Sequence, residues 1–567
     1  MFKTKNSLVE LSARERAKAV LDPGSFREIL GPFDRFESPH LMKQGIVPQS
    51  DDGIVVARGL IGGESAVVIS MEGAFLGGGI GEVAGAKIAG SLEMALRDNQ
   101  NGVKVRPVVL FDTGGVRLQE ANYGLLAISE ICAAVVALRS YIPVVGVIPG
   151  KIGCFGGMSI AASLFSTLIM TREGRFGLNG PEVIEQEAGI EEFDSRDRQL
   201  IWGAIGGMQR FVTGLVDEVV EDDVGEVTKA IQSAFEKGIP KQHRTEYVDR
   251  NLLLLQSIEP GQKLDPLSVR ALRKEMKEQG EGVTHPSISD ADQGNLAGIS
   301  ESRGRVWFHA LTGIDHPNSV VPSVWHADTL FGEERIRFIS VVPNHTPRFP
   351  RAKQGEVGVE EGWAIAKYVR DAIEQDREGE RRAIVAIVDV PSQAYGYREE
   401  LLGIHYACGA AADAYAQARL AGHPVIALLV GNAISGAFLA HGLQANRILA
   451  LDDEEVKVQA MSKQSATRIT RRTGEEFDEA AKLVPAMAYD IRSFASLGAV
   501  HDLLQGIQAD SPDEKDITTV VDKLKEAIAD ARRSPRDLRN RLHSKAALDR
   551  GRVASIQVRN RLGEQWG

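Results

Sequence analysis

Four loops of small residues in this chain could stabilise negative charge that develops on an oxygen atom. They are Thr113-Gly114-Gly115, Phe155-Gly156-Gly157, Ser392-Gln393-Ala394 and Ser435-Gly436-Ala437. Each lies where a predicted strand ends and a predicted helix follows, and backbone N–H groups at such junctions point outward without partners. Two such groups on one oxygen form an oxyanion hole. One glycine pair alone is typical of a tight turn, so the prediction depends on four loops at matched positions.

Polar and aromatic side chains that could orient a substrate carboxylate or donate a proton follow these loops. In the first half they are Arg117, Glu120 and Tyr123, and in the second half Gln393, Tyr395, Arg398, Glu399 and His405. Pairing across a helix surface is the alternative role for the charged members of this set. The histidines show no H-x-x-x-H or H-x-H spacing, so no metal site is expected. His405 and His441 are the histidines that could reach a cleft.

Other enzyme classes find less support. Residues 79–84 fit the G-x-G-x-x-A dinucleotide pattern, but Asp98, about 20 positions later, falls in a predicted helix instead of at a strand end. Lys87 is not followed by Ser or Thr, so a phosphate-binding Walker loop is absent. Ser159 and Ser435 stand near predicted helix starts but not in G-x-S-x-G, which predicts capping or packing instead of nucleophilic attack.

The elements that must position the four loops occur twice along the chain in the same order. Residues 66–71 and 336–342 predict the first strand of each half, and residues 107–112 and 384–389 predict a second, buried strand. Between them, a glycine-rich segment enters an amphipathic helix through Gly-Glu-Val in both halves. From this glutamate to the aspartate that ends the second strand is 30 residues in the first half and 33 in the second.

A third strand and a turn of small residues complete each half. From Pro143 to Gly156 is 13 residues, and from Pro424 to Gly436 is 12. Strands that alternate with helices predict an α/β architecture with right-handed crossovers. We expect a first domain over residues 1–240, a linker with short helices over 241–302, and a second domain over 303–567 that ends in a charged helical tail.

Composition and charge restrict the class of protein. The 567 residues are 43% hydrophobic and 25% charged, which suffices for two or three domains. A formal charge of -11 and a pI near 5.7 argue against nucleic acid or an anionic membrane as the main partner. Three cysteines cannot build a disulfide framework or a four-thiolate zinc site. No signal peptide or membrane span is apparent, so a cytoplasmic protein is expected.

The loops resemble those of the carboxyltransferase family of acyl-CoA carboxylases. DTGGVRLQE looks like the family's Ser-Gly-Gly-Ala-Arg-Met-Gln-Glu loop, and NGPEVIEQEAG looks like its Gly-Pro-Arg-Val-Ile-Glu-Gln segment. The chain is still more similar to the β and γ subunits of biotin-independent malonate decarboxylase joined together. GGGIGEVAGAKIAGSLEMALRD and KIGCFGGMSIAASL carry this resemblance in the first half, and RFPRAKQGEVGVEEGWAIA and HPVIALLVGNAISGAFLAHGLQANRILAL carry it in the second. It covers about residues 20–240 and 303–505.

The resemblance implies two crotonase (ClpP/crotonase-like) domains of the ββα superhelix type that form one active site. It implies decarboxylation of a malonyl thioester on an acyl carrier protein to an acetyl thioester and CO2. The thiol would belong to a phosphopantetheine-type, dephospho-CoA-derived group on the carrier, so this chain binds no cofactor covalently, although CoA could bind. The implied partners are the carrier protein and an acyltransferase (α) subunit in a hetero-oligomer.

The family's oxyanion pairs can be carried over to this sequence. Gly114 and Gly115 match the first pair, and Gly436 with Ala437 occupies the second, where carboxyltransferases have Gly-Gly. In a carboxyltransferase the second pair faces biotin, so here it could hold the departing carboxylate or only shape the pocket. We expect the thioester carbonyl to accept N–H bonds from Gly115 and the Gly156-Gly157 turn, so that the enolate left by CO2 is already solvated by fixed dipoles.

Several further expectations follow from this assignment. The candidate proton donors are Tyr123, Tyr395 and His405, and a basic rim for an acidic carrier protein is expected at Arg348, Arg351 and Lys353. The sequence has no biotin-attachment Met-Lys-Met and no four-cysteine zinc ribbon, which favours the decarboxylase. The alternatives are a biotin-dependent carboxyltransferase subunit and a non-catalytic scaffold that docks a carrier protein.

Overall fold

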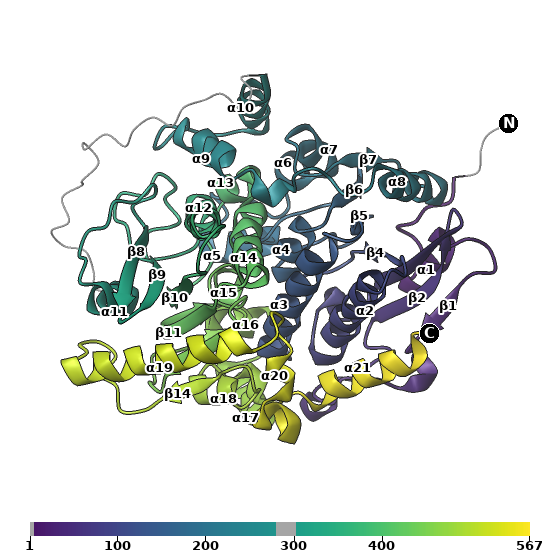
Figure 1. The fold of residues 1–567 in the computed structure, drawn as a ribbon. Coiled ribbons are helices and arrows are strands. Elements are labelled where there is room, and N and C mark those ends of the chain that lie inside the picture. The colour runs from purple at the N-terminus through teal and green to yellow at the C-terminus, as the bar shows by residue number, and fades with distance from the viewer. Residues whose placement is uncertain (1–4, 279–301) are drawn as a thin grey trace. The chain divides into compact units, whose positions relative to one another are not determined.

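The computed structural model describes residues 5–278 and 302–567 (Figure 1). The chain forms two compact units, each assembled from more than one stretch of sequence. Unit 1 consists of Met1–Arg244, Lys463–Met487 and Arg552–Gly567, and unit 2 consists of Thr245–Ser462 and Ala488–Gly551. The domain limits expected from the sequence, at residues 240 and 303, stay a prediction. In the folded chain, two segments from beyond residue 303 belong to unit 1.

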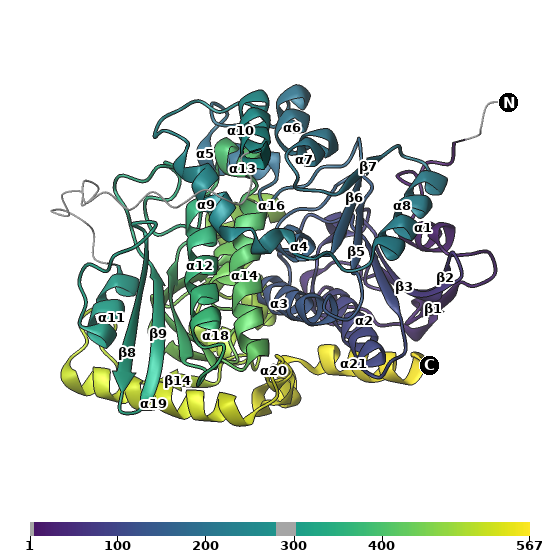
Figure 2. The ribbon, with the colours of Figure 1, turned by 45° about the horizontal axis from the view of Figure 1, so that its top comes forward.

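Unit 1 contains one mixed sheet whose strands lie side by side in chain order, from β1 to β7 (Figure 2). The strands up to β3 pair antiparallel, and those from β3 onward pair parallel. Their bounds are β1 Arg27–Ile29, β2 Ile54–Ile61, β3 Glu64–Met71, β4 Arg106–Leu110, β5 Val145–Ile148, β6 Thr167–Thr171 and β7 Glu218–Val220. β-Branched residues fill β3 and β4 because helices cover both faces of these strands.

Helices α1 and α8 pack on one face of the sheet of unit 1, and α2 lies against its other face and contacts α3. The helices of the unit in the first half of the chain are α1 Ala13–Val20, α2 Glu82–Gln100, α3 Ala121–Leu138, α4 Gly157–Ser163, α5 Pro181–Ala188, α6 Arg198–Ile205, α7 Gly207–Val212 and α8 Val224–Lys237. Those added from later segments are α16 Lys463–Thr470, α17 Gly474–Leu483 and α21 Val553–Gln565.

Unit 2 contains a second mixed sheet, with strand order β14-β12-β11-β10-β9-β8 and β13 beside β11. Only the β8–β9 pair is antiparallel among the strands of the described chain in this unit. The bounds are β8 Val324–Phe331, β9 Glu334–Val341, β10 Ala383–Val390, β11 Val425–Ile434, β12 Arg447–Leu451, β13 Val458–Gln459 and β14 Asp502–Leu504.

The helices of unit 2 include two in the predicted linker. They are α9 Val248–Gln256, α10 Pro266–Glu278, α11 Arg303–Thr312, α12 Val359–Gln375, α13 Tyr397–Leu402, α14 Ile404–Ala421, α15 Ser435–Ala440, α18 Ile491–Ala495, α19 Glu514–Arg533 and α20 Asn540–His543. The short helices expected in the linker are present as α9 and α10, and α9 packs on α12. Residues 279–301 of the predicted linker lie outside the described residues.

The two units repeat the order of elements that the sequence predicts. β3, α2, β4, α3, β5 and α4 of unit 1 correspond to β9, α12, β10, α14, β11 and α15 of unit 2. The aspartate at the end of the second predicted strand has the same role in both. Asp112 accepts the N–H of Ile152 at 2.9 Å, and Asp389 accepts the N–H of Asn432 at 3.0 Å. The predicted α/β layering in both halves is thereby confirmed.

Helix α3 is the one helix in the described chain that is long and apolar enough to cross a bilayer. Its apolar window is 89% buried inside the protein. Such burial is typical of a core helix, because the apolar surface that lipid would cover already contacts protein.

Candidate active site

In unit 1, the loops that follow β4 and β5 are hydrogen bonded to each other. The N–H of Thr113 donates to the carbonyl of Gly153 at 2.8 Å, and the N–H of Phe155 donates to the carbonyl of Thr113 at 3.0 Å. Gly115 and Gly156 touch, because a Cβ atom on Gly115 would lie 2.8 Å from the Cα of Gly156. Both have positive φ, at 106° and 57°. The fold therefore brings the two predicted glycine loops of this half together, and only glycine fits the contact.

Three of the predicted N–H donors already have acceptors inside the unit. These pairs are Gly114 with the carbonyl of Gly77 at 2.8 Å, Gly115 with the hydroxyl of Thr113 at 3.0 Å, and Gly156 with the carbonyl of Leu178 at 2.8 Å. The prediction that these three amides meet a substrate oxygen needs correction in this arrangement. The glycines in the sequence indicate where the loops approach each other. They do not reveal which groups accept these N–H hydrogen bonds, because two of the three acceptors, on Gly77 and Leu178, belong to other segments.

Two neighbouring N–H groups, those of Val116 and Gly157, have no acceptor among residues 5–278 and 302–567. Each directly follows one of the two touching glycines, so each N–H lies within one residue of the contact. Val116 is fixed from both sides, because Ile80 donates to the carbonyl of Gly115 at 2.8 Å and accepts from the N–H of Arg117 at 2.9 Å. Gly157 begins α4. Gly157 belongs to the predicted set, and Val116 is a residue that sequence reasoning missed.

Behind this loop lies a buried ion-pair group. Arg117 Nη1 donates to Asp52 Oδ1 and to Glu120 Oε2, both at 2.7 Å, and none of the three side chains is more than 2% exposed. Burial raises the pKa of Asp52 to about 6 although Arg117 opposes the shift. Burial is the largest effect on Glu120 and acts to raise its pKa, but the charges of Arg117 and His40 and the hydrogen bonds from Arg117 and Glu82 together outweigh it, so the pKa is lowered. Arg117 and Glu120 hold the loop from behind, and their predicted contact with a substrate stays a prediction.

Tyr123 lies next to this group on α3. Its ring stacks on His40, with centroids 4.6 Å apart and planes at 23°, and its side chain is 4% exposed. Burial, followed by the charge of Glu82, raises the pKa of the phenol well above its ordinary value. The hydroxyl is therefore a poor acid in this state, and its predicted role as proton donor stays a prediction.

In unit 2, the loops that follow β10 and β11 also meet. The side-chain oxygen of Gln393 accepts the N–H of Gly436 at 3.0 Å. Val357 donates to the carbonyl of Ser392 and accepts from the N–H of Ala394, both at 3.0 Å. Ile80 surrounds Val116 in the same manner in unit 1, so Gln393 occupies the position of Val116. The predicted second pair thus has one N–H, that of Gly436, bound to a side chain of the protein.

The remaining predicted residues of unit 2 are spread around these loops. Ala437 is buried in α15, next to Gly436, and His405 is buried in α14 with its ring centroid 4.9 Å from that of Tyr406. Tyr395 is half-buried. Arg398 donates to the carbonyl of Gln262. Their predicted contacts with a substrate stay predictions.

Both ring nitrogens of His441 lie within hydrogen-bond distance of groups inside unit 2. Its Nδ1 lies 3.0 Å from the hydroxyl of Tyr415, and its Nε2 lies 3.0 Å from the carbonyl oxygen of Ile387. Burial lowers the pKa of His441 to about 4, so the ring is neutral at pH 7. The expectation that His441 could reach a cleft is wrong, because both ring nitrogens are engaged inside the unit.

The predicted basic rim is divided between the interior and the surface. Arg348 donates to Glu360 at 3.0 Å and to the carbonyl of Ile258 at 2.7 Å, so its charge is already compensated. Arg351 is half-buried and Lys353 is exposed. Lys353 is therefore the member of this set that is open to an acidic partner.

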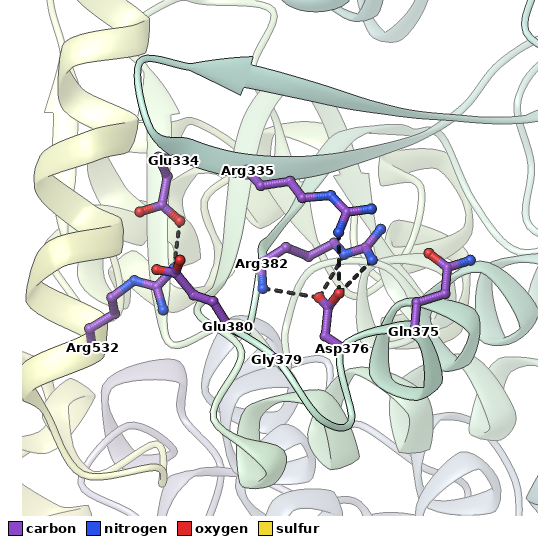
Figure 3. Close-up of a pocket in the computed structure, with 8 residues that line it drawn as sticks. All are labelled: Glu334, Arg335, Gln375, Asp376, Gly379, Glu380, Arg382 and Arg532. Atoms are coloured by element: carbon purple, nitrogen blue, oxygen red, sulfur yellow. Dashed lines mark hydrogen bonds and ion pairs between the residues drawn. The ribbon is translucent and has the colours of Figure 1, made fainter.

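A hollow on unit 2 is lined by charged side chains but by none of the predicted site residues (Figure 3). Arg382 binds Asp376 through Nε at 2.7 Å, and Arg532 of α19 binds Glu334 at 2.5 Å. This pairing satisfies the charges, so the hollow is a structural ion-pair network. Elsewhere in the described chain, no group of three or more His, Cys, Asp or Glu side chains is placed to hold a metal ion.

Sequence-family comparisons divide the chain as its two halves do. The model of the carboxyl transferase domain matches residues 6–299, and the model of the malonate decarboxylase gamma subunit matches residues 352–566. The crotonase fold expected of a carboxyl transferase domain agrees with the mixed, mainly parallel sheets and covering helices of both units. The predicted fold class is thus confirmed.

Two curated relatives come from Malonomonas rubra and match different parts of the chain. The malonyl-S-ACP:biotin-protein carboxyltransferase MADC is 40% identical over 241 residues, which are 41% of this chain and 76% of the relative. The malonyl-S-ACP:biotin-protein carboxyltransferase MADD is 42% identical over 164 residues, which are 28% of this chain and 56% of the relative. Among solved structures, a chain of a Pseudomonas malonate decarboxylase hetero-tetramer in complex with malonate is 56% identical and matches 47% of this chain and 98% of its own length, with a TM-score of 0.47.

Proposed function

Because this chain belongs to the carboxyl transferase family, we propose that it is the fused, β-like and γ-like component of a malonate decarboxylase. Its reaction is the decarboxylation of a malonyl thioester, carried by an acyl carrier protein, to an acetyl thioester and CO2. The observation that carries the chemical part of the proposal is the pair of N–H groups on Val116 and Gly157, which have no acceptor in the described chain and stand at the contact of two loops.

The chemistry needs a place for negative charge. When the bond between the carboxylate carbon and the central carbon of the malonyl group breaks, its electron pair passes into the thioester and the carbonyl oxygen becomes an enolate oxygen. The N–H groups of Val116 and Gly157 would hold that oxygen, and removing one such donor typically costs about 3 kcal/mol of barrier. A proton then adds to the central carbon. A pocket poor in water favours the reaction, because the compact carboxylate loses more solvation than the delocalised enolate.

The loops are fixed before any substrate arrives, which supports this assignment. Both the N–H and the carbonyl of Thr113 are hydrogen bonded to the loop that follows β5, and Gly115 and Gly156 are in contact. Donors held this way need no rearrangement when charge develops, and such preorganisation is the source of their catalytic effect. Gly114, Gly115 and Gly156 would then act by shaping the site, and Gly157 by donating to the substrate.

The partners belong to the same proposal. The thioester would be supplied by an acyl carrier protein through a phosphopantetheine-type, dephospho-CoA-derived group, and an acyltransferase subunit would load that carrier within a cytoplasmic hetero-oligomer. Related solved structures are of a malonate decarboxylase hetero-tetramer and of a complex with coenzyme A, which supports a hetero-oligomer and a CoA-like ligand. Exposed Lys353 is the proposed point of contact for an acidic carrier.

A second candidate function is transfer of the carboxyl group to biotin. The observation in its favour is that both Malonomonas relatives are malonyl-S-ACP:biotin-protein carboxyltransferases. In this chain, Gly436 at the second predicted oxyanion pair donates to Gln393 instead of remaining open. This engagement favours decarboxylation without a second acceptor.

The two functions can be separated with the purified full chain. It would be incubated with malonyl, methylmalonyl and acetyl thioesters of carrier protein and of CoA, and release of CO2 would be followed with and without avidin. Release from the malonyl thioester that persists with avidin and without a biotinylated partner supports the decarboxylase. Release that requires a biotinylated protein supports the transferase. A chain that releases no CO2 in either case, while still binding the carrier protein, would be a scaffold.

A further inference from the structure

The C-terminal helix α21 lies along α2 of unit 1 (Figures 1 and 2). Its apolar residues Val558 and Leu562, and Trp566 directly after it, are at most 2% exposed. Leu562 sits so close to Gly90 that a Cβ atom on this glycine would lie 2.7 Å from its Cδ1. The helix therefore packs closely on α2, although the two segments are more than 400 residues apart in sequence.

Opposite charges line the two sides of this contact. Arg552 binds Glu130 at 2.8 Å, and Arg559 binds both Glu93 at 2.9 Å and Glu130 at 2.8 Å. Arg552 and Glu130 are almost fully buried. A buried charge without a partner costs several kcal/mol, so Glu93 of α2 and Glu130 of α3 select a basic helix at this position.

One contact of α21 reaches the first residue of α2. The N–H and the hydroxyl of Ser555 both donate to Oε1 of Glu82, at 3.0 and 3.1 Å. His40 Nε2 lies 2.6 Å from Oε2 of the same carboxylate. Ser555 is fully buried and Glu82 is 3% exposed. Without α21, one oxygen of this carboxylate would lose both donors that satisfy it.

From Glu82, hydrogen bonds continue to the candidate active site. The N–H of Glu82 donates to Oε1 of Glu120 at 3.2 Å, and Oε2 of Glu120 accepts from Arg117 at 2.7 Å. Arg117 is the residue after Val116, and its own N–H is fixed by Ile80. Four buried residues, Ser555, Glu82, Glu120 and Arg117, thus connect the C-terminal helix to the loop that presents one of the two open N–H groups, with the step from Glu82 to Glu120 made by the backbone N–H of Glu82.

We propose that α21 is an intramolecular ligand of unit 1, and that its docking sets the position of Glu82 and, through Glu120 and Arg117, of the loop at Val116. The helix presents Ser555, Arg559 and Leu562 on one face, and its flanking residues Arg552 and Trp566 continue the same spacing of successive turns. A helix with these basic, hydroxyl and apolar side chains on one face is the partner that α2 and α3 recognise. The effect on turnover rests on the proposed function, whereas the docking and the ordering of the loop do not.

The test uses the full chain with a protease site inserted between Asp549 and Arg550, two exposed residues. After cleavage, gel filtration in low salt should leave the fragment that begins at Arg550 bound to the rest of the protein, and a low concentration of urea should release it, because salt screens buried ion pairs only weakly. A synthetic peptide of residues 552–567 is then returned. Its binding is measured by fluorescence anisotropy, amide hydrogen exchange is followed in residues 113–120, and kcat and KM are measured with the malonyl thioester.

We expect release of the fragment to speed exchange in residues 113–120 and to lower kcat about tenfold, or about 1.4 kcal/mol, with KM changed less than about twofold. The peptide should reverse both effects. A peptide with Ser555→Asp, which places a second carboxylate against Glu82, should bind at least about tenfold more weakly because like charges would be buried together. A peptide with Gln557→Ala, on the exposed side of the helix, is the matched control and should behave as the natural one.

The outcomes that contradict the proposal are separate for each part. A fragment that elutes alone in low salt, or a Ser555→Asp peptide that binds as well as the control, would overturn docking by this face. Exchange in residues 113–120 that does not respond to the peptide would overturn the positioning of the loop. If exchange responds but no thioester is turned over under any condition, the positioning stands and the proposed function fails.

Discussion

Glu120 and Glu399 occupy equivalent positions in the two units, and each accepts the N–H of the first residue of the helix that follows the first predicted strand. Glu120 accepts from Glu82 at 3.2 Å, and Glu399 accepts from Val359 at 3.1 Å. Their other neighbours differ in charge. Glu120 is bound by Arg117, whereas Glu399 faces Glu361, which accepts from Gly358 at 3.0 Å and from Ser323 at 2.5 Å.

The charge state of the two glutamates therefore differs. Burial acts to raise the pKa of Glu120, but Arg117, together with the charge of His40 and the hydrogen bond from Glu82, lowers it. Burial, followed by the charge of Glu361, raises the pKa of Glu399 to about 8, and burial, followed by the charge of Glu360, raises the pKa of Glu361 to about 7. One helix start is thus bound by a carboxylate and the other by a carboxyl group that keeps its proton at neutral pH.

The first prediction concerns the pH dependence of stability. The unfolded chain releases the protons of Glu361 and Glu399 near pH 4.5, whereas the folded chain holds them until about pH 7 to 8. Their contribution to the free energy of unfolding is therefore fully present below pH 4.5, falls as the pH rises, and is lost above about pH 8. The Glu399→Gln substitution mimics the protonated form. Between pH 5 and 8, the free energy of unfolding measured in urea should therefore fall less in this variant than in the natural chain, by at least about 1 kcal/mol.

The equivalent change in unit 1 is the control for this measurement. Glu120→Gln removes a negative charge that Arg117 binds, so the variant should be less stable than the natural chain at pH 7. An equal effect of the two substitutions on the pH profile would contradict the assigned charge states.

A second prediction concerns Arg117 itself. In Arg117→Met, Asp52 and Glu120 remain buried without their cation, which should reduce the free energy of unfolding at pH 7 by about 3–5 kcal/mol. The loss should shrink toward pH 5, because protonation relieves both carboxylates. Arg106→Met is the matched control, since Arg106 pairs with Glu64, which is half exposed, and such a pair is worth at most about 1 kcal/mol. Similar losses in the two variants would show that Arg117 has no special role in the interior.

A third prediction addresses the open N–H group of Gly157. Proline is well tolerated at the first position of a helix, so Gly157→Pro removes this N–H with little cost to folding. The variant should lose about 100-fold to 1,000-fold in kcat for the malonyl thioester while its melting temperature stays near that of the natural chain. Gly157→Ala keeps the N–H and serves as the comparison. Equal turnover of the proline and alanine variants would remove this amide from the mechanism.

A fourth prediction concerns the thiols. Cys132, Cys154 and Cys408 are each at most 1% exposed. Burial raises the pKa of Cys154, and burial together with nearby Glu399 raises that of Cys408. A thiol reagent at pH 8 should therefore react with none of the three in the native chain and with all three in denaturant, because the reactive species is the thiolate. Rapid reaction of one thiol in the native chain would place it near the surface.

Some elements escaped sequence reasoning for an identifiable reason. β2 (Ile54–Ile61) forms a hairpin with β3 through Gly62 and Gly63, both with positive φ, but Arg58 and Gly59 interrupt its apolar run. Val116 carries no glycine signal, and its N–H is left open only by the register of Ile80 beside it. Both cases depend on pairing between segments instead of on composition.

The sequence by itself determined the repeated order of strands and helices, the positions of the glycine loops and the family of the chain, because apolar periodicity and glycine placement are local properties. The tertiary structure alone decided which N–H groups stay open, since the carbonyls of Gly77 and Leu178 come from other parts of the chain. It also decided the charge of Glu120 and Glu399 and the docking of α21, because a buried group responds to the residues that folding brings against it, whatever their distance in sequence.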